Sequence, residues 1–312
     1  MSNKLKMFLS NFRSMVGNHH FLHSNTYLHA YQLKLLQRNL DTLNLSLHEV
    51  GFKVYSQWEE DGIIDFLVSS LNIRKPRILE LGAGNFLESN SRYICEYSSA
   101  AAYVVDARED LPKGVSSSGL EWKTHIFSEV TWITPTNISE ICLRAQEKLG
   151  RIDILSIDLD GQDYWVLKEI DLSKIQIVIC EFNPIFGNKI KVSVPENSSF
   201  VRSKSTKNLF WGGSLNLFST YMSSQGFNLV GTNLVANNAF FVRNDLMNRI
   251  RIKNDESLNN FEQLDYLIRE SIDIHGNLDY FSYSESLNVI KEQLVFNAED
   301  DSIVPLGPLL GL

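Results

Sequence analysis

Residues Arg77–Asn90, RILELGAGNFLESN, decide the fold of this chain. The mostly apolar run Ile78–Leu81 is too short for a helix and leads into a glycine turn, so it predicts a buried strand. Glycines at positions 82 and 84 allow a sharp bend and let a ligand approach the main chain closely. Ligands of doubly wound sheets bind beyond the carboxyl ends of the strands, which is where this turn would lie.

The acidic residue before the turn narrows the choice of ligand. Glu80, Gly82 and Gly84 form the pattern E-x-G-x-G, which favours S-adenosylmethionine (SAM) over a dinucleotide. A second apolar run, Ala101–Arg108 (AAYVVDAR), predicts the next strand and contains Asp106. Because the acid at this point of such a unit holds a ribose, we expect Asp106 to bind the ribose hydroxyls.

Acidic residues recur where later strands are predicted to end. A buried strand over 152–157 is followed by Asp158, Asp160 and Asp163, which repel one another unless a cation or hydrogen-bond donors compensate. One of them could cap the next helix, but three predict a functional acidic edge. The strand 177–180 likewise ends in Glu181. In a parallel sheet these ends share one edge, so we expect the carboxylates of the four strand ends to converge on a single cleft.

The whole composition bounds the function. The chain has 312 residues and a net charge of −8, with no basic cluster of the kind that binds nucleic acid. No apolar segment is long enough to span a bilayer, and the first residues lack the apolar core of a signal peptide. The three cysteines, Cys95, Cys142 and Cys180, are expected to be reduced and buried. These features predict a cytoplasmic protein.

The layout predicted along the chain has three parts. A helical N-terminal extension (1–50) is expected to form a lid or a homodimer contact, with weak contact to a membrane surface as the alternative. Residues 51–245 are expected to form a Rossmann-like α/β core, a mostly parallel doubly wound sheet with a third strand at 122–127. An antiparallel hairpin (227–230 and 238–243) would close this sheet. Residues 188–210 read as a long loop beside the acceptor, and 246–312 as a helix and loop extension.

Four ordered motifs resemble one family. They are YSQWEEDGII (55–64), ILELGAGNFLESNSRYI (78–94), LSIDLDGQDYWVL (155–167) and IVICEFN (177–183). In order and spacing they resemble the FkbM-like branch of class I SAM-dependent methyltransferases, and within it bacterial proteins associated with surface-polysaccharide biosynthesis. The resemblance runs from about Val50 to Arg243. It implies a core that binds SAM and transfers its methyl group, commonly to an oxygen nucleophile.

The resemblance also implies roles for individual positions. Glu80, Gly82 and Gly84 would line the methionine and adenosine side, while Gln57 and Asp61 would lie at the approach to the cofactor. The resemblance places Asp106 at the ribose. Apart from the resemblance, Asn90 is predicted either to cap the next helix or to donate to a cofactor carboxylate, and Asp158 completes the predicted cofactor contacts. One departure is Glu59, where relatives often have glycine.

Methyl transfer requires an aligned nucleophile and a group that removes its proton. Asp158, Asp160 or Glu181 could be that base. The alternative is a divalent cation such as Mg²⁺, held by Asp158, Glu181 and Asn183, that acidifies a hydroxyl group. The first functional hypothesis is O-methylation of a sugar, glycan or sugar nucleotide. The rivals are an NAD-linked oxidoreductase and a catalytically silent scaffold in a glycan-assembly complex.

Overall fold

The computed structural model describes residues 19–253, 271–273 and 275–312. The chain divides into two units, Met1–Asp41 and Thr42–Leu312. The described part of the first unit consists of the helix α2 (His19–Arg38) and residues 39–41, so this helix ends before the predicted helical extension, 1–50, does. Two short 3-10 helices, η2 (Thr42–Asn44) and η3 (His48–Val50), open the second unit. Residues 1–18 of the predicted extension lie outside the described residues.

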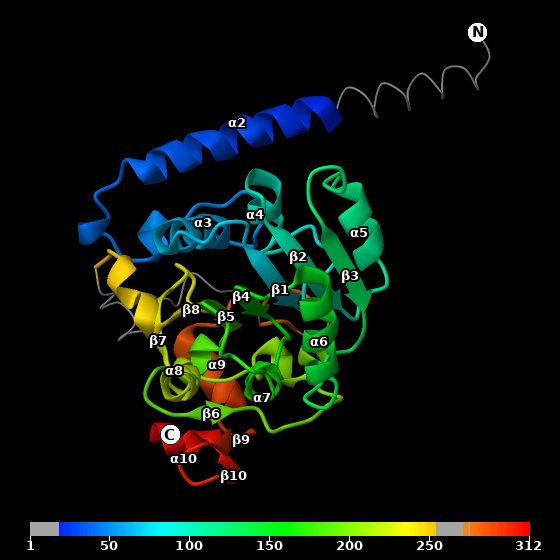
Figure 1. The fold of residues 1–312 in the computed structure, drawn as a ribbon. Coiled ribbons are helices and arrows are strands. Elements are labelled where there is room, and N and C mark those ends of the chain that lie inside the picture. Colours follow the sequence, from blue (N-terminus) through cyan, green and yellow to red (C-terminus); the bar gives the residue numbers. More distant parts are fainter. Residues whose placement is uncertain (1–18, 254–270, 274) are drawn as a thin grey trace, which may run out of the picture. The chain divides into compact units, whose positions relative to one another are not determined.

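A seven-stranded sheet forms the centre of the second unit, and its strand order is β3-β2-β1-β4-β5-β8-β7 (Figure 1). The strands are β1 (Arg77–Leu81), β2 (Ala101–Asp106), β3 (Ile126–Val130), β4 (Ile154–Ile157), β5 (Ile177–Glu181), β7 (Phe227–Thr232) and β8 (Asn238–Arg243). Only β8 runs against its neighbours in this sheet. The predicted Rossmann-like sheet with a closing hairpin is therefore confirmed, although β3 begins later than the predicted strand 122–127.

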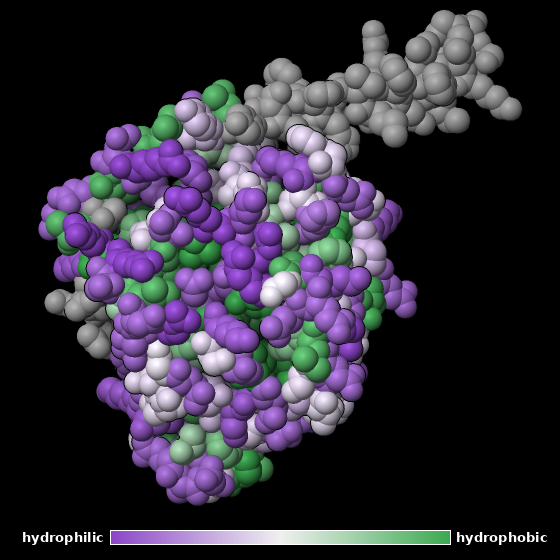
Figure 2. Space-filling model, viewed as in Figure 1, coloured by the Kyte–Doolittle hydropathy of each residue, from purple (hydrophilic) through white to green (hydrophobic). Residues whose placement is uncertain are grey.

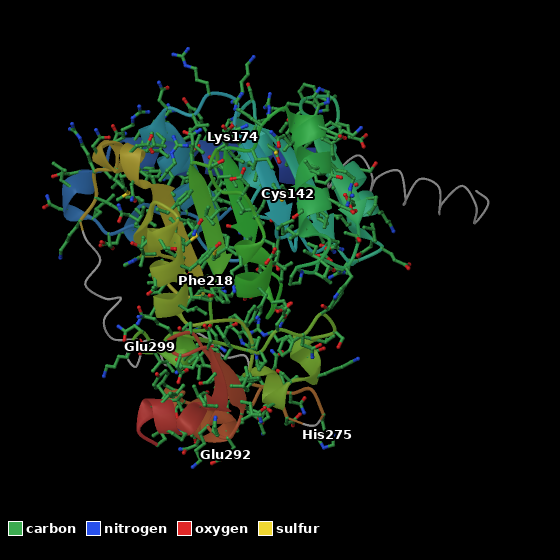
Figure 3. All side chains as sticks on the ribbon, turned by 60° about the horizontal axis from the view of Figure 1, so that its bottom comes forward. Cys142, Lys174, Phe218, His275, Glu292 and Glu299 are labelled. Atoms are coloured by element: carbon green, nitrogen blue, oxygen red, sulfur yellow. The ribbon has the colours of Figure 1, made fainter. Side chains whose placement is uncertain are left out.

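Helices cover both faces of this sheet (Figure 1). One layer holds α3 (Glu60–Leu71), α4 (Arg92–Tyr97) and α5 (Leu111–Ser117), and the other holds α6 (Ile138–Leu149), α7 (Asp163–Lys168) and α8 (Leu215–Ser224). In α6, apolar residues at helical spacing form a buried stripe: Ile138, Ile141, Ala145 and Leu149. Figure 3 labels Phe218 on α8, which belongs to the core of this second layer, and the half-buried Cys142 on α6, which packs against that core.

The pairing register places several strand ends at one level of the sheet. The last pairs are Leu81 with Val105, Leu81 with Ile157, and Ile157 with Cys180. The residues that follow these pairs are Gly82, Asp106, Asp158 and Glu181. Because side chains alternate along a strand, these four positions share the face covered by α3, α4 and α5. Glu80 points to the same face two residues earlier, about 7 Å deeper along β1.

The C-terminal region adds a second, smaller sheet. Its order is β10-β9-β6, from β6 (Val192–Ser193), β9 (Leu294–Asn297) and β10 (Ser302–Pro305), with α9 (Tyr283–Ile290) and α10 (Leu306–Leu310) beside it. Phe186, Val192, Ile290 and Leu306 belong to its separate apolar core. Strands therefore occur in both regions that the sequence predicted as loop or as helix and loop.

Short 3-10 helices connect these parts: η4 (Pro184–Phe186), η5 (Arg202–Lys204), η6 (Thr206–Asn208) and η7 (Asn244–Arg249). Figure 3 shows Lys174, just before β5, at the opposite end of the sheet from His275 in the segment 271–280. The face seen in Figure 2 is largely hydrophilic, with smaller hydrophobic areas between the polar residues. None of the helices in the described ranges is long and apolar enough to cross a membrane.

Candidate functional site

A cleft of about 580 Å³ opens at the carboxyl ends of the central strands. Its lining comes from the ends of β1, β2, β3 and β4, from the segment 200–208 and from two residues of the C-terminal region, Ile272 and Leu278. The residues concerned are Gly82, Asp106, Ala107, Thr131, Trp132, Ile133, Asp158, Leu159, Asp160, Gln162, Phe200, Val201, Arg202, Ser203, Asn208, Ile272 and Leu278. The cleft therefore lies where the sequence predicted a ligand site.

The two glycines of the turn meet different constraints. Gly82 has a φ of +87°, and a Cβ there would lie 1.6 Å from the backbone oxygen of Asp158. Glycine at this position therefore lets β1 and β4 approach each other at the floor of the cleft. Gly84 has a φ of +57°, but a Cβ there would have no atom within 4 Å. Its need for glycine is conformational only.

Asp106 is fixed at the end of β2 by backbone donors. One carboxylate oxygen accepts a hydrogen bond from the Gly84 N–H at 2.7 Å and the other accepts one from the Arg108 N–H at 2.9 Å. Partial burial raises the pKa of Asp106, against the effect of these donors. The carboxylate faces the cleft with its orientation set, and it retains acceptor capacity for hydroxyl groups.

Three carboxylates gather at the ends of β4 and β5. Asp158, Asp160 and Glu181 each place an oxygen within 4.8 Å of the others. Glu181 is 3% exposed, and its Oε2 has no hydrogen-bond partner in the described part of the chain. Burial, together with the charges of Asp160 and Asp163, raises the pKa of Asp158 to about 8. Burial and the neighbouring Asp158 likewise raise the pKa of Glu181 well above its ordinary value.

Asp163 supports the loop rather than the cluster. Its carboxylate accepts hydrogen bonds from the Leu159 N–H at 2.7 Å and the Gly161 N–H at 3.0 Å. Burial nevertheless raises its pKa to about 6. Asp163 thus orders the turn that carries Asp160, which has a left-handed backbone conformation with a φ of +54°.

Arg202 is the basic residue at this cluster, and the sequence analysis did not single it out. Its guanidinium lies 2.8 Å from Asp160 Oδ1 and 3.4 Å from Glu181 Oε1. It also stacks over the indole ring of Trp211 at 3.9 Å from the ring centroid. Arg202 is the single arginine in residues 188–210. Because a carboxylate as buried as that of Glu181 requires a counter-charge, that arginine was the available signal.

Glu80 does not line the cleft. Its carboxylate accepts hydrogen bonds from the Ser89 hydroxyl at 2.6 Å, the Asn90 N–H at 2.8 Å and the Ser91 N–H at 3.1 Å. Burial raises the pKa of Glu80, although these donors lower it. Of the four acids predicted to converge on the cleft, Asp106 and Asp158 line it, and Glu181 lies beside Asp158 without lining it. Glu80 instead binds the loop that follows its own strand.

Other predicted cofactor residues also lie outside the lining of this cleft. The Asn90 amide donates to the Ser156 hydroxyl at 3.1 Å, beside Glu80. Gln57 is exposed. Asp61 is buried, and one of its oxygens accepts hydrogen bonds from the N–H groups of residues 54, 55 and 56. Burial raises its pKa to about 7. Asp61 thus orders the loop that carries Gln57.

Asn183, predicted as a metal ligand, is bonded within the protein. Its amide nitrogen donates to the backbone oxygens of Leu209 at 2.9 Å and Trp211 at 3.0 Å, and its amide oxygen accepts from the Ile185 N–H at 3.0 Å. These bonds join the end of β5 to the segment that carries Trp211. Asn183 thereby supports the position of the Arg202 stacking partner.

The remaining walls are largely apolar. Trp132 and Ile133 follow β3, while Phe200 and Val201 lead into η5 and Ile272 comes from the C-terminal region. The Ile272 N–H donates a hydrogen bond to the backbone oxygen of Lys207, which joins this part of the C-terminal region to the segment 200–208. These positions were not predicted as site residues, since single apolar side chains in irregular segments carry no periodic signal.

One known protein family has a model that matches this chain. The model of the methyltransferase FkbM domain family matches residues 51–210, about half of the 312-residue chain. The matched range contains β1 to β5, the acidic cluster and Arg202. A comparison with curated proteins gives no match.

Similar solved structures include three methyltransferases. TrmK of M. capricolum, bound to S-adenosylhomocysteine, is 13% identical with a TM-score of 0.31, over 56% of this chain and 65% of that chain. The O-methyltransferase TomG of Streptomyces achromogenes, bound to SAM, is 11% identical with a TM-score of 0.35, over 62% and 83%. The O-methyltransferase of Bacillus cereus, bound to S-adenosylhomocysteine, is 12% identical with a TM-score of 0.35, over 68% and 88%.

Proposed function

Because the chain belongs to the FkbM methyltransferase domain family and is a SAM-dependent methyltransferase, we propose that it methylates a hydroxyl oxygen of a sugar, glycan or sugar nucleotide. We further propose that this reaction belongs to surface-polysaccharide biosynthesis, because the four motifs resemble those of bacterial proteins associated with that process. Membership of this family favours methyl transfer over the alternative of an NAD-linked oxidoreductase. The observation that carries the proposal is that the half-buried Asp158 lines the cleft together with Gly82 and Asp106, and that the buried Glu181 has a carboxylate oxygen within 4.8 Å of it.

The cleft offers groups that suit the separate parts of SAM: a carboxylate acceptor, apolar side chains and a glycine turn. Asp106 would hold the ribose hydroxyls, since backbone N–H groups already fix its carboxylate toward the cleft. Trp132 and Ile133 would contact the adenine with their apolar surfaces, and the turn at Gly82 would face the methionine portion. Bound SAM supplies an electrophilic methyl group on a positively charged sulfur.

The acidic pair would accept the proton of the acceptor hydroxyl. A sugar hydroxyl is a weak acid, so a base whose pKa lies near the working pH assists its attack. Burial raises the pKa of Asp158 to about 8, which places it in that range. In the proposed step the hydroxyl oxygen forms a bond to the methyl carbon while the carbon–sulfur bond breaks. The hydroxyl proton moves to the Asp158 and Glu181 pair.

A divalent cation is the second candidate for the same step. Asp158, Asp160 and Glu181 offer oxygen ligands of the kind that Mg²⁺ prefers. A cation held between them would have to displace the guanidinium of Arg202, which already contacts Asp160 and Glu181. Methyl transfer measured with a chelator, and again after Mg²⁺ is restored, distinguishes the two. Loss and recovery support the cation, and unchanged rates support the carboxylate pair alone.

Cofactor binding is tested by calorimetric titration with SAM and S-adenosylhomocysteine. Wild-type protein should bind both saturably, and Asp106→Asn should weaken SAM binding about tenfold because it loses charge-assisted hydrogen bonds. Asp110→Asn is the matched control, since Asp110 is an exposed acid in the next turn and pairs with Arg108. Absence of saturable binding by the wild-type protein would contradict the proposed cofactor site.

The acceptor class is tested by transfer of a labelled methyl group to a panel of neutral sugars, glycans and sugar nucleotides. Label should appear on a hydroxyl oxygen in at least one of these classes. Saturable SAM binding without transfer to any of them would contradict the proposed acceptor and favour the silent-scaffold hypothesis.

A further inference from the structure

The segment 194–202, whose last residues line the cleft, is bonded to elements that follow β3 and β4. The indole N–H of Trp132, after β3, donates to the backbone oxygen of Ser198 at 2.7 Å. The indole N–H of Trp165, on α7, donates to the backbone oxygen of Val194 at 2.9 Å. These two bonds attach the segment at points on either side of residues 195–197.

Gln162 attaches the segment between these two points. Its amide nitrogen donates to the backbone oxygen of Pro195 at 3.2 Å, and its amide oxygen accepts from the Asn197 N–H at 2.8 Å. The side chain is 7% exposed, and it belongs to the turn after β4 that also carries Asp158. A buried amide that uses its donor and its acceptor on one segment fixes the position of that segment.

Phe200 packs directly on the same turn. Its ring lies so close to Gly161 that a Cβ there would be 2.3 Å from Phe200 Cε1. The ring is half-buried and lines the cleft, as Asp158 does. An aromatic ring in this place offers an apolar surface on which the C–H groups of a sugar ring can pack.

We propose that Phe200 forms the surface on which the sugar ring of the acceptor packs, and that Gln162 is the positioning residue that holds this surface beside Asp158. The assignment rests on the proposed function, because it takes a sugar hydroxyl as the nucleophile. SAM would contact a different part of the lining, at Asp106 and Ile133. Changes at positions 162 and 200 should therefore alter acceptor binding and leave SAM binding intact.

Single variants test the two roles by steady-state kinetics and by calorimetric titration with SAM. Gln162→Met keeps the length of the side chain and removes both hydrogen bonds, so the KM for the acceptor should rise about tenfold. Phe200→Leu removes the ring and should raise the same KM about tenfold, whereas Phe200→Tyr keeps the ring and should stay within about twofold of wild type. In all three, kcat and the Kd for SAM should remain within about twofold of wild type.

The double variant shows whether Gln162 acts through Phe200. If it does, adding Gln162→Met to Phe200→Leu should raise the KM for the acceptor by no more than about twofold beyond Phe200→Leu alone. Effects that multiply would mean that the two side chains act independently, and they would overturn the positioning role. A Kd for SAM that rises as much as the KM for the acceptor would show a general structural role and would also overturn it.

The matched control is Gln176→Met. The Gln176 amide donates to the Asp153 carboxylate at 3.2 Å, just before the first residues of β5 and β4 and so at the far end of these strands from the cleft. This variant loses a glutamine hydrogen bond of the same kind, and it should leave the KM for the acceptor unchanged. A rise equal to that of Gln162→Met would contradict a role specific to the segment 194–202.

A measurement without any acceptor separates this inference from the proposed function. In Gln162→Met the Asn197 N–H loses its partner, so its hydrogen exchange should be at least about tenfold faster than in wild type. Gln176→Met should not change it. Unchanged exchange in Gln162→Met would overturn the positioning role. Faster exchange together with no methyl transfer to any sugar would instead contradict the proposed acceptor.

Discussion

Two acidic strand ends on the same face of the sheet have different surroundings. Glu80, at the end of β1, accepts hydrogen bonds from one hydroxyl and two backbone N–H groups. Glu181, at the end of β5, has one long contact to Arg202 at 3.4 Å, and an oxygen atom without a hydrogen-bond partner among the described residues. Both side chains are almost fully buried. The number of donors, rather than burial, is what separates them.

The difference shows how the chain uses its acids. A buried carboxylate that is surrounded by donors holds a loop in place, whereas one that lacks donors keeps a strong tendency to take up a proton. The loop that follows β1 supplies its own donors within eleven residues of Glu80. The ends of β4 and β5 instead face a distant segment that supplies one arginine. The first arrangement suits a structural role and the second suits proton transfer.

The largest expected effect comes from changing Asp158, the neighbour of Glu181 in the acidic cluster. Asp158→Asn should lower kcat for methyl transfer by about 10²- to 10⁴-fold, because the amide cannot accept the hydroxyl proton. The fold should persist, since the change removes a charge that burial disfavours. Steady-state kinetics with circular dichroism of the variant check both points. A loss of less than threefold would remove Asp158 from the proposed step.

The two glycines of the turn after β1, Gly82 and Gly84, should differ in how much their substitution destabilises the fold. Gly82→Ala should destabilise the fold by about 3 kcal/mol or more, because a Cβ would overlap the Asp158 backbone oxygen and displace β4. Gly84→Ala should cost only about 1 kcal/mol, from its left-handed backbone. Denaturant unfolding measures both free energies. Equal losses would mean that close packing of β1 on β4 is not the constraint at Gly82.

Removing the acid that is surrounded by donors should affect stability first. Glu80→Ala should lower the free energy of unfolding by roughly 2–3 kcal/mol, because it leaves the donors at residues 89–91 buried without a partner. Asp158→Ala should cost less in the same assay, since Asp158 has fewer donors to abandon. Urea unfolding of the two variants compares them directly. A greater loss for Asp158→Ala would reverse the assignment of roles.

A last expected effect is on the pH dependence of stability. Burial raises the pKa of Asp61 to about 7, of Asp163 to about 6 and of Asp158 to about 8. The native state therefore binds more protons than the unfolded chain between about pH 4 and pH 8, and stability should fall as the pH rises across this range. Scanning calorimetry should give a higher melting temperature at pH 5.5 than at pH 8.5. A midpoint that rises over this interval would show that the buried acids are ionised in the native state.

Much of the architecture could be read from the sequence because short apolar runs mark the buried strands. The runs that contain β1, β2, β4 and β5 end close to acids, and parallel strands bring those ends to one edge. Strand β3 was misplaced because its residues are only partly buried and its pattern is weak. The strands β6, β9 and β10 were missed because a two-residue or four-residue strand gives little periodic signal.

The sequence alone determined the family, the fold and the acids at the strand ends, since these depend on local patterns and on their order. Only the tertiary structure decided which acid meets donors and which faces the cleft. That outcome depends on the register between strands, which places Glu80 deeper than Asp158 and Glu181. It depends also on a loop remote in sequence that brings Arg202 to the cluster. Neither the depth of a side chain nor the origin of its counter-charge is encoded in the residues next to it.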